Sequence, residues 1–188
     1  DWTWIKNRQG QNDHKLTDSS RGVTKIWEAN TSAAEQTESG VTAFGADGFT
    51  LGSDGQFNSS SELYASWNWR MNGGTTSTNT LGNVTSTVQV DPTGNMSIIT
   101  YTGTGVSGNT VGHGLSQAPD AARVYPTNSH DMRLDTNAFA ANASLFPGGQ
   151  SFDNVTATVY PMASNAPVNN NGSSYVGYFF SNVKGFIQ

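Results

Sequence analysis

The chain has 188 residues, a formal net charge of −5, and only 12% charged residues. Its nine Lys and Arg residues are scattered, which argues against the clustered positive charge that binding to a nucleic-acid backbone requires. Cysteine is absent, which excludes disulfides and thiolate chemistry, and no apolar run reaches the length of a transmembrane helix. We therefore expect neither a nucleic-acid partner nor membrane insertion.

The chain is rich in Gly, Ser, Thr and Asn and poor in strong helix formers, which favours turns and short β-strands. Several segments alternate apolar and polar residues, carry β-branched or aromatic side chains, and are bounded by turn residues. In chain order, the predicted strands are Trp2–Arg8, Leu63–Trp69, Val84–Val90, Ser97–Gly105, Ala121–Pro126 and Ser174–Val183. The prediction is an all-β protein.

Two segments depart from this pattern. Thr24–Ser39 contains Ala and Glu, but its apolar residues are irregularly spaced, so we expect a short helix or turn there at best. Residues 73–83 are poor in apolar side chains and typical of a flexible linker.

An internal repeat is the main organising feature of the sequence. The stretch SSELYASWNW (Ser60–Trp69) returns in a weaker form as GSSYVGYFF (Gly172–Phe180), with Tyr64 aligned to Tyr175. A second match aligns Asp1 with Asp120, at a slightly different offset that a loop deletion would explain. These matches predict two related antiparallel, sandwich-like units, at residues 1–72 and 84–188, joined by the linker.

The repeat also predicts that the first unit lacks a lead-in strand. Ser97–Pro119 precedes the second copy, and its counterpart would lie before Asp1. We therefore expect an open sheet edge at residues 1–8, which another chain or an upstream domain could fill by strand addition. In the repeated strand, alternation places Leu63, Ala65, Trp67 and Trp69 on one face, and this apolar set is expected to point inward.

No catalytic, cofactor or metal site is predicted. His14, His113 and His130 have no partners at ligand spacing, and the glycines around His113 predict a corner with a backbone hydrogen bond. Most carboxylates precede Gly or Pro, which is typical of turns rather than of a hydrolytic pair. Asp47 and Asp54 offer oxygen ligands for calcium, but a complete calcium-binding loop is missing.

Aromatic residues are the candidate binding residues. Exposed tryptophans can present flat apolar faces to sugar rings, whereas alternating tryptophans on strands more often belong to a core or a subunit interface. The candidates for a glycan site or an interface are Trp2, Trp4, Trp27, Trp67, Trp69, Tyr64 and Tyr175.

The chain resembles a known family through a series of motifs spread along nearly its whole length. They are DWTWIKNR, RGVTKIW, DGFTLGSDG, YASWNW, ITYTGTG, VGHGLSQAPD and NGSSYVGYFFSNVKGF. Together they resemble a domain of unknown function that is common in virion structural and tail-fibre-like proteins of marine bacteriophages, especially cyanophages. That domain often adjoins a concanavalin-A-like lectin domain.

The resemblance implies a virion protein on the particle surface, in a tail fibre or other extracellular appendage, with no established activity. We expect self-assembly into a homo-oligomer, such as a trimer or polymer, alongside other virion proteins and host attachment through a surface glycan. Two alternatives are a lectin-like receptor-binding module and a subunit of a non-viral extracellular filament. A glycan-cleaving enzyme would need two carboxylates facing each other across a groove, and we predict that the protein is not an enzyme.

Overall fold

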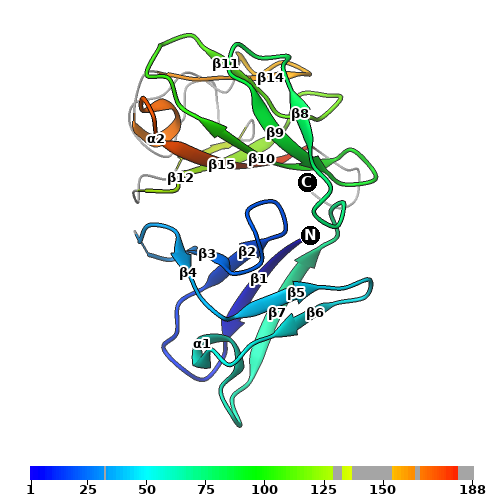
Figure 1. Ribbon diagram of the computed structural model, residues 1–188, viewed down its shortest axis with the longest axis vertical. Coiled ribbons are helices and arrows are strands. Elements are labelled where there is room, and N and C mark those ends of the chain that lie inside the picture. Colours follow the sequence, from blue (N-terminus) through cyan, green and yellow to red (C-terminus); the bar gives the residue numbers. More distant parts are fainter. Residues whose placement is uncertain (32, 129–132, 137–153, 164–165, 182–188) are drawn as a thin grey trace. The chain divides into compact units, whose positions relative to one another are not determined.

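The computed structural model describes residues 1–31, 33–128, 133–136, 154–163 and 166–181, and it is built almost entirely from antiparallel strands (Figure 1). The chain divides into two compact units, Asp1–Gly74 and Thr75–Gln188. The all-β prediction is confirmed. In the described part of the chain, no helix is both long enough and apolar enough to span a membrane.

Unit 1 contains a five-stranded sheet in the order β4-β3-β2-β1-β7, a separate β5-β6 hairpin and one short helix. Its elements are β1 (Trp2–Asn7), β2 (Lys15–Asp18), β3 (Lys25–Glu28), β4 (Gln36–Thr37), β5 (Val41–Phe44), β6 (Phe49–Leu51), α1 (Gly55–Asn58) and β7 (Tyr64–Trp69). The hairpin and α1 bring Val41 and Phe57 against Ile5 and Ile26 of the sheet, and these four side chains form one buried apolar cluster of the unit.

The predicted turn or short helix at Thr24–Ser39 is wrong, because this segment contains strands β3 and β4. Tertiary contacts override the helix propensity of its Ala and Glu residues. Ile26 and Trp27 are buried, and Lys15 on the adjacent strand β2 forms ion pairs with Glu28 at 2.8 Å and Glu38 at 3.0 Å. The glutamates that favour a helix in the sequence instead neutralise a buried lysine.

Burial disfavours the charges of this cluster, but its hydrogen bonds outweigh that effect. Glu28 and Glu38 raise the pKa of Lys15 despite its desolvation, and hydrogen bonds from Lys15 and Thr31 lower the pKa of Glu28 despite burial. The Lys15 side chain is fully buried, so all of its compensation comes from protein groups. The cluster is therefore a charged, desolvated part of the interior of unit 1.

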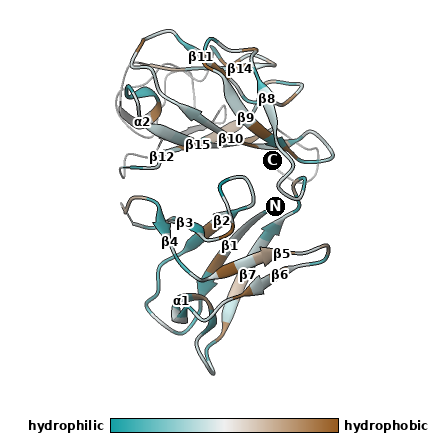
Figure 2. Ribbon diagram, viewed as in Figure 1, coloured by the Kyte–Doolittle hydropathy of each residue, from teal (hydrophilic) through white to brown (hydrophobic). Residues whose placement is uncertain are grey.

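Unit 2 contains a six-stranded sheet in the order β13-β12-β15-β10-β9-β8 and a two-stranded sheet of β11 and β14. Its elements are β8 (Ser77–Asn79), β9 (Ser86–Val90), β10 (Met96–Thr102), β11 (Thr110–Gly112), β12 (Ala121–Pro126), β13 (Arg133–Thr136), β14 (Val159–Pro161), α2 (Ala166–Asn169) and β15 (Ser174–Phe180). A large apolar core includes Ile99, Val111, Tyr160 and Phe179 from both sheets. The loops between strands are mostly hydrophilic (Figure 2).

All six segments predicted as strands contain a strand, although the ends differ by a few residues. Part of the predicted linker at 73–83 is also a strand, because β8 pairs with β9 through Ser77 and Val88. The interpretation of this stretch as a flexible linker is therefore wrong for Ser77–Asn79. Its Ser, Thr and Asn side chains suit a short, largely exposed edge strand as well as they suit a linker.

The two units contain the same strand pair in the same register. In unit 1, β1 pairs with β7 from Trp2 opposite Trp69 to Asn7 opposite Tyr64. In unit 2, β12 pairs with β15 from Ala121 opposite Phe180 to Pro126 opposite Tyr175. The repeat alignment of Asp1 with Asp120 and of Tyr64 with Tyr175 reproduces every one of these pairs. The backbone bond from Arg8 N to Leu63 O has its counterpart in Thr127 N to Ser174 O, both 2.8 Å long.

The short helices match in the same way. Each is a four-residue helix with a buried apolar side chain at the equivalent position, Phe57 in α1 and Val168 in α2. After each helix, a strand tyrosine receives a hydrogen bond from the backbone: Ser59 N to Tyr64 Oη at 3.0 Å, and Asn170 N to Tyr175 Oη at 2.7 Å.

The connection between helix and strand has a positive φ at the equivalent position in both units, Ser61 (66°) and Gly172 (75°). Ser61 adopts this left-handed conformation even though its Cβ disfavours it. The backbone path into β7 is therefore the same as the path into β15.

The open edge of unit 1 does not lie where the sequence predicts it. Strand β1 is central, because β2 covers one side and β7 the other. The terminal strand is β7, the last in the order β4-β3-β2-β1-β7. The prediction of an open edge at residues 1–8 is wrong. The strand that follows α1 is β7, and it pairs with β1 on the side that was expected to be open.

Candidate functional site

Four of the predicted aromatic residues gather on the β1-β7 strand pair. Because directly opposite residues in antiparallel strands share a face, Trp2 meets Trp69, and Trp4 meets Trp67. The rings of Trp2 and Trp69 stack with centroids 4.2 Å apart, and those of Trp4 and Trp67 lie 5.2 Å apart at 45°. The two pairs lie on the same face of the sheet, where Trp2 is buried and Trp67 is 48% exposed.

The other three candidates are elsewhere. Trp27 on β3 is buried, and Leu16 lies between it and Trp4 across the strands. Tyr64 lies on the opposite face of β7, against the core, and Tyr175 is buried in unit 2, where it stacks on Tyr101. Tyr64 and Tyr175 both bond to the backbone beside the helices, so the structure gives them a local packing role.

The prediction that the apolar set of the repeated strand points inward is wrong for Leu63 and Trp67, whereas Ala65 and Trp69 are half-buried. On β7, Tyr64 packs against the core cluster and Ser66 and Asn68 are exposed, whereas on the other face Leu63 is 57% exposed and Trp67 is 48% exposed. Apolarity alone suggested the other face, but the core of unit 1 is closed by α1 and the β5-β6 hairpin on the Tyr64 side. Trp67 is thus left exposed on β7, the terminal strand of the sheet.

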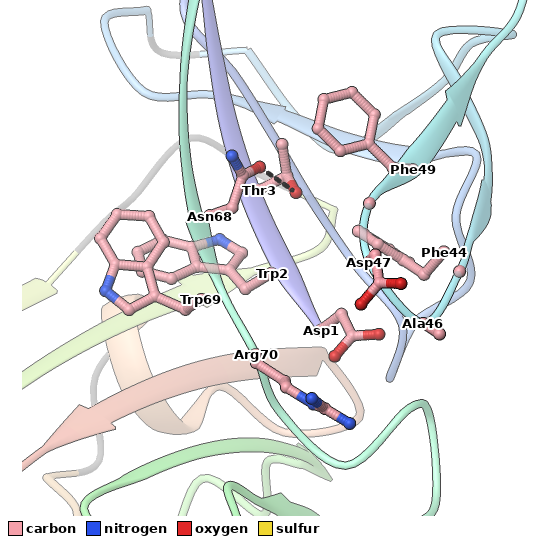
Figure 3. Close-up of a pocket in the computed structure, with 12 residues that line it drawn as sticks. Asp1, Trp2, Thr3, Phe44, Ala46, Asp47, Phe49, Asn68, Trp69 and Arg70 are labelled. Atoms are coloured by element: carbon pink, nitrogen blue, oxygen red, sulfur yellow. Dashed lines mark hydrogen bonds between the residues drawn. The ribbon is translucent and has the colours of Figure 1, made fainter.

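A pocket of about 340 Å³ lies at the end of the β1-β7 pair, beside the turn of the β5-β6 hairpin (Figure 3). Its lining comes from three segments: Asp1–Thr3, Phe44–Phe49 and Asn68–Arg70. Trp69 and the two phenylalanines provide apolar surface, and Asp1, Asp47, Asn68 and Arg70 provide charged and polar groups. This mixture of ring faces and hydrogen-bonding groups is typical of a site for a polar ligand with apolar patches.

Several pocket groups are held in place by hydrogen bonds. Thr3 Oγ1 donates to Asn68 Oδ1 at 3.0 Å, the bond drawn in Figure 3, and Met71 N donates to the Asp1 carboxylate at 3.0 Å. The hairpin turn that carries Asp47 is closed by the backbone bond from Gly45 N to Gly48 O at 2.7 Å. These contacts orient the side chains of Asp1, Thr3 and Asn68 and close the backbone of the hairpin turn.

Sequence reasoning found only part of this pocket. It named Trp2 and Trp69 as aromatics and Asp47 as a turn residue, but it did not bring Phe44, Asn68 or Arg70 to the same place. The pairing of β1 with β7 and the fold of the hairpin over their end create the pocket, and neither is encoded in a local motif. The one available signal was the Asp-Gly turn at Asp47, which marks a hairpin tip.

The two described histidines, His14 and His113, belong to different units. His113 is buried, with Nε2 3.1 Å from Thr156 O and Nδ1 accepting from Leu115 N, so the predicted backbone bonding is confirmed. Burial lowers the pKa of His113, and the two bonds suit the neutral ring. His14 lies beside Trp4, with ring centroids 5.7 Å apart, and His130 lies outside the described residues.

The calcium hypothesis for Asp47 and Asp54 finds no support in their placement. Asp54 caps α1 by accepting from Gln56 N at 2.8 Å, whereas Asp47 lies in the hairpin turn. Over the described ranges, no group of three or more His, Cys, Asp or Glu residues is placed to hold a metal ion.

Comparisons with known proteins identify a family for the chain but no individual curated protein or solved structure. No curated protein matches the chain, and no solved structure matches it. A family model described as a domain of unknown function matches residues 1–188, the full length of the sequence. The chain therefore belongs to the DUF7483 family.

Proposed function

We propose that the protein is a structural module of a bacteriophage virion, in a tail fibre or surface appendage, that acts by self-assembly. The observation that carries this proposal is the edge strand β7: Leu63 and Trp67 are exposed beside a sheet edge with which no other strand of the described residues pairs. Exposed apolar residues on an edge strand favour association with another chain. The virion setting rests on the motif resemblance, and it places the protein at the particle surface with other virion proteins as neighbours.

We also propose that the two units descend from one duplicated β unit. The shared register of β1-β7 and β12-β15, the matching helices and the matching tyrosine bonds support this origin. A duplicated β unit suits an appendage, because repeated modules lengthen a fibre without requiring a new fold.

The assembly proposal predicts a mass in solution greater than that of one chain. Light scattering paired with electron microscopy of the purified protein should show a defined oligomer or a filament. Leu63→Lys adds a charge beside the β7 edge, where lysine disfavours edge pairing, and should reduce the mass toward that of a monomer. Leu81→Lys is the matched control, because Leu81 is 67% exposed and belongs to unit 2, whereas β7 belongs to unit 1.

Two outcomes would contradict assembly through this edge. One is a wild-type protein that stays monomeric over the concentration range of the experiment. The other is an oligomer that Leu63→Lys and Leu81→Lys weaken equally, which would move the interface away from β7.

A second candidate function is glycan binding, favoured by the pocket beside the β5-β6 hairpin. Its aromatic rings and its carboxylate, amide and guanidinium groups are the chemistry that sugar-binding sites use. In a phage appendage, such a pocket would serve attachment to a host surface glycan. A glycan-binding pocket of this kind would also suit a subunit of a non-viral extracellular filament.

A glycan array tests this candidate directly. The wild-type protein should bind a defined set of glycans, and Asp47→Ala should weaken that binding about tenfold, the effect of losing one charged hydrogen bond. Thr42→Ser, on β5 outside the pocket lining, should bind like the wild type. An array without any binding, or equal binding by Asp47→Ala, would count against a glycan site in this pocket.

A further inference from the structure

The outer edge of β7 presents a regular row of backbone groups. The bond from Arg8 N to Leu63 O sets the alternation of hydrogen-bonded pairs between β1 and β7. By that alternation, Leu63, Ala65, Trp67 and Trp69 turn their backbone groups toward β1. The N–H and C=O groups of Tyr64, Ser66 and Asn68 therefore point to the opposite side, where no strand within the described ranges pairs with β7.

The equivalent row in unit 2 is fully paired. Tyr175, Gly177 and Phe179 hold the positions of Tyr64, Ser66 and Asn68, and they lie opposite Tyr101, Ile99 and Ser97 of β10. The bonds from Gly103 N to Ser173 O at 2.8 Å and from Ser181 N to Asn95 O at 2.9 Å bracket this pairing. In unit 2, a seven-residue antiparallel strand thus occupies the side that is open on β7.

The side chains show what that strand supplies. Ile98 of β10 lies opposite Tyr178, which is fully buried, whereas the equivalent residue of unit 1, Trp67, is 48% exposed. On the other face, Tyr101 stacks on Tyr175 with centroids 5.1 Å apart and donates to Val168 O at 2.7 Å. The residues equivalent to Tyr175 and Val168 in unit 1 are Tyr64 and Phe57.

The β7 edge carries none of the usual protection against pairing. Its sequence, YASWNW, contains no Lys, no Pro and no charge, the features by which exposed edges resist added strands. Its polar residues, Ser66 and Asn68, are small enough to lie flat beside an incoming strand.

We propose that the β7 edge binds an added antiparallel strand of the β10 type, supplied by another polypeptide of the same kind as unit 2. The strand has apolar residues opposite Trp67 and Ser66, as Ile98 and Ile99 lie opposite Tyr178 and Gly177, and an aromatic residue opposite Tyr64. It completes the sheet of unit 1 in the register already present in unit 2. This inference rests on the proposed assembly function and names the partner of its edge.

A peptide with the sequence of residues 95–103, labelled with a fluorophore, is a direct probe of this edge. Fluorescence anisotropy with the full chain should show saturable binding, and the fluorescence of exposed Trp67 should change on binding. Ser66→Pro should weaken binding at least about tenfold, because it removes an outward N–H and places a ring at the edge. The bonds between β1 and β7 remain intact in this variant, since Ser66 does not donate to β1.

Two controls separate edge pairing from loss of structure. Ser66→Ala keeps the outward N–H and should bind the peptide like the wild type. A second peptide of the same sequence is N-methylated at Ile99, the residue that lies opposite Gly177 in unit 2. It lacks the central N–H needed for pairing and should fail to bind the wild-type protein. This second probe remains informative even if Ser66→Pro does not fold.

The outcomes distinguish this inference from the assembly proposal. Absence of peptide binding, or equal binding by Ser66→Pro and the N-methylated peptide, overturns the added strand. A dimer of the wild type that Ser66→Pro abolishes, without any peptide binding, also overturns it, and shows instead that two β7 edges pair with each other. Monomeric protein that nevertheless binds the peptide would overturn self-assembly while upholding the strand site.

Discussion

Lys15→Met is expected to lower the free energy of unfolding of unit 1 by about 3 kcal/mol, the lower end of the range for breaking a buried ion pair. Lys15 Nζ contacts both Glu28 and Glu38, and its side chain is inaccessible to solvent. Methionine preserves most of the apolar stem but leaves two nearly buried carboxylates without their cation. Urea denaturation followed by tryptophan fluorescence measures the loss selectively, because all five Trp residues lie within Asp1–Gly74.

Lys25→Met is the matched control. Lys25 lies on strand β3, opposite Thr37 of β4, and its Nζ donates to Thr37 Oγ1 at 2.9 Å, but its side chain is 41% exposed. Solvent screens its ion pair with Glu35, so the control should lose no more than about 1 kcal/mol. Equal losses for the two variants would show that burial does not make the Lys15 cluster special.

The same cluster gives unit 1 a pH dependence with a defined sign. The pKa of Glu28 is lower in the folded protein than in the unfolded chain, so its contribution is present above the unfolded pKa. The contribution is lost as pH falls through the lowered folded pKa. In Lys15→Met, this part of the acid sensitivity should shrink.

Phe57→Ala is expected to destabilise unit 1 by about 3–5 kcal/mol, the usual cost of truncating a buried phenylalanine. Phe57 is the one buried side chain of α1, and it fills the core between Ile5, Ile26 and Val41. The surroundings are shaped to its ring: a Cβ at Gly40 would lie 2.3 Å from the Phe57 ring. The cavity left by alanine therefore has few neighbours able to collapse into it.

Phe57→Leu tests whether lost volume explains the effect. Leucine keeps most of the apolar volume and should cost about 1.5 kcal/mol. Tryptophan fluorescence during urea denaturation again reports on unit 1 alone. If Phe57→Ala unfolds at the same urea concentration as Phe57→Leu, the helix α1 does not anchor the core of the unit as the structure implies.

The fold class was predictable because the strands carry a local signal. Alternating residues and turn residues at their ends located β1, β7, β9, β10, β12 and β15. The similarity of Tyr64 and Tyr175 also located two strands whose pairing registers agree. Both signals depend on residues that are close in sequence or on direct likeness between two segments.

The faces and edges of the sheet were not predictable in the same way. Alternation divides β7 into two sets of side chains, but which set faces the core depends on where α1 and the β5-β6 hairpin pack. Likewise, β1 was expected at an edge because its upstream neighbour was absent, whereas β7 pairs with it across more than fifty intervening residues. The pocket arises from the same long-range pairing, so no single sequence motif predicted that Asn68 and Arg70 would line it.

The exposed edge of β7 also affects the protein between its synthesis and its assembly. A flat, uncharged strand that displays leucine and tryptophan is a template on which other unfolded or nascent chains can add themselves. Every newly made copy therefore competes between its proper neighbour and unproductive aggregation. A high yield of folded protein would therefore require that the partner that covers β7 is produced at the same time.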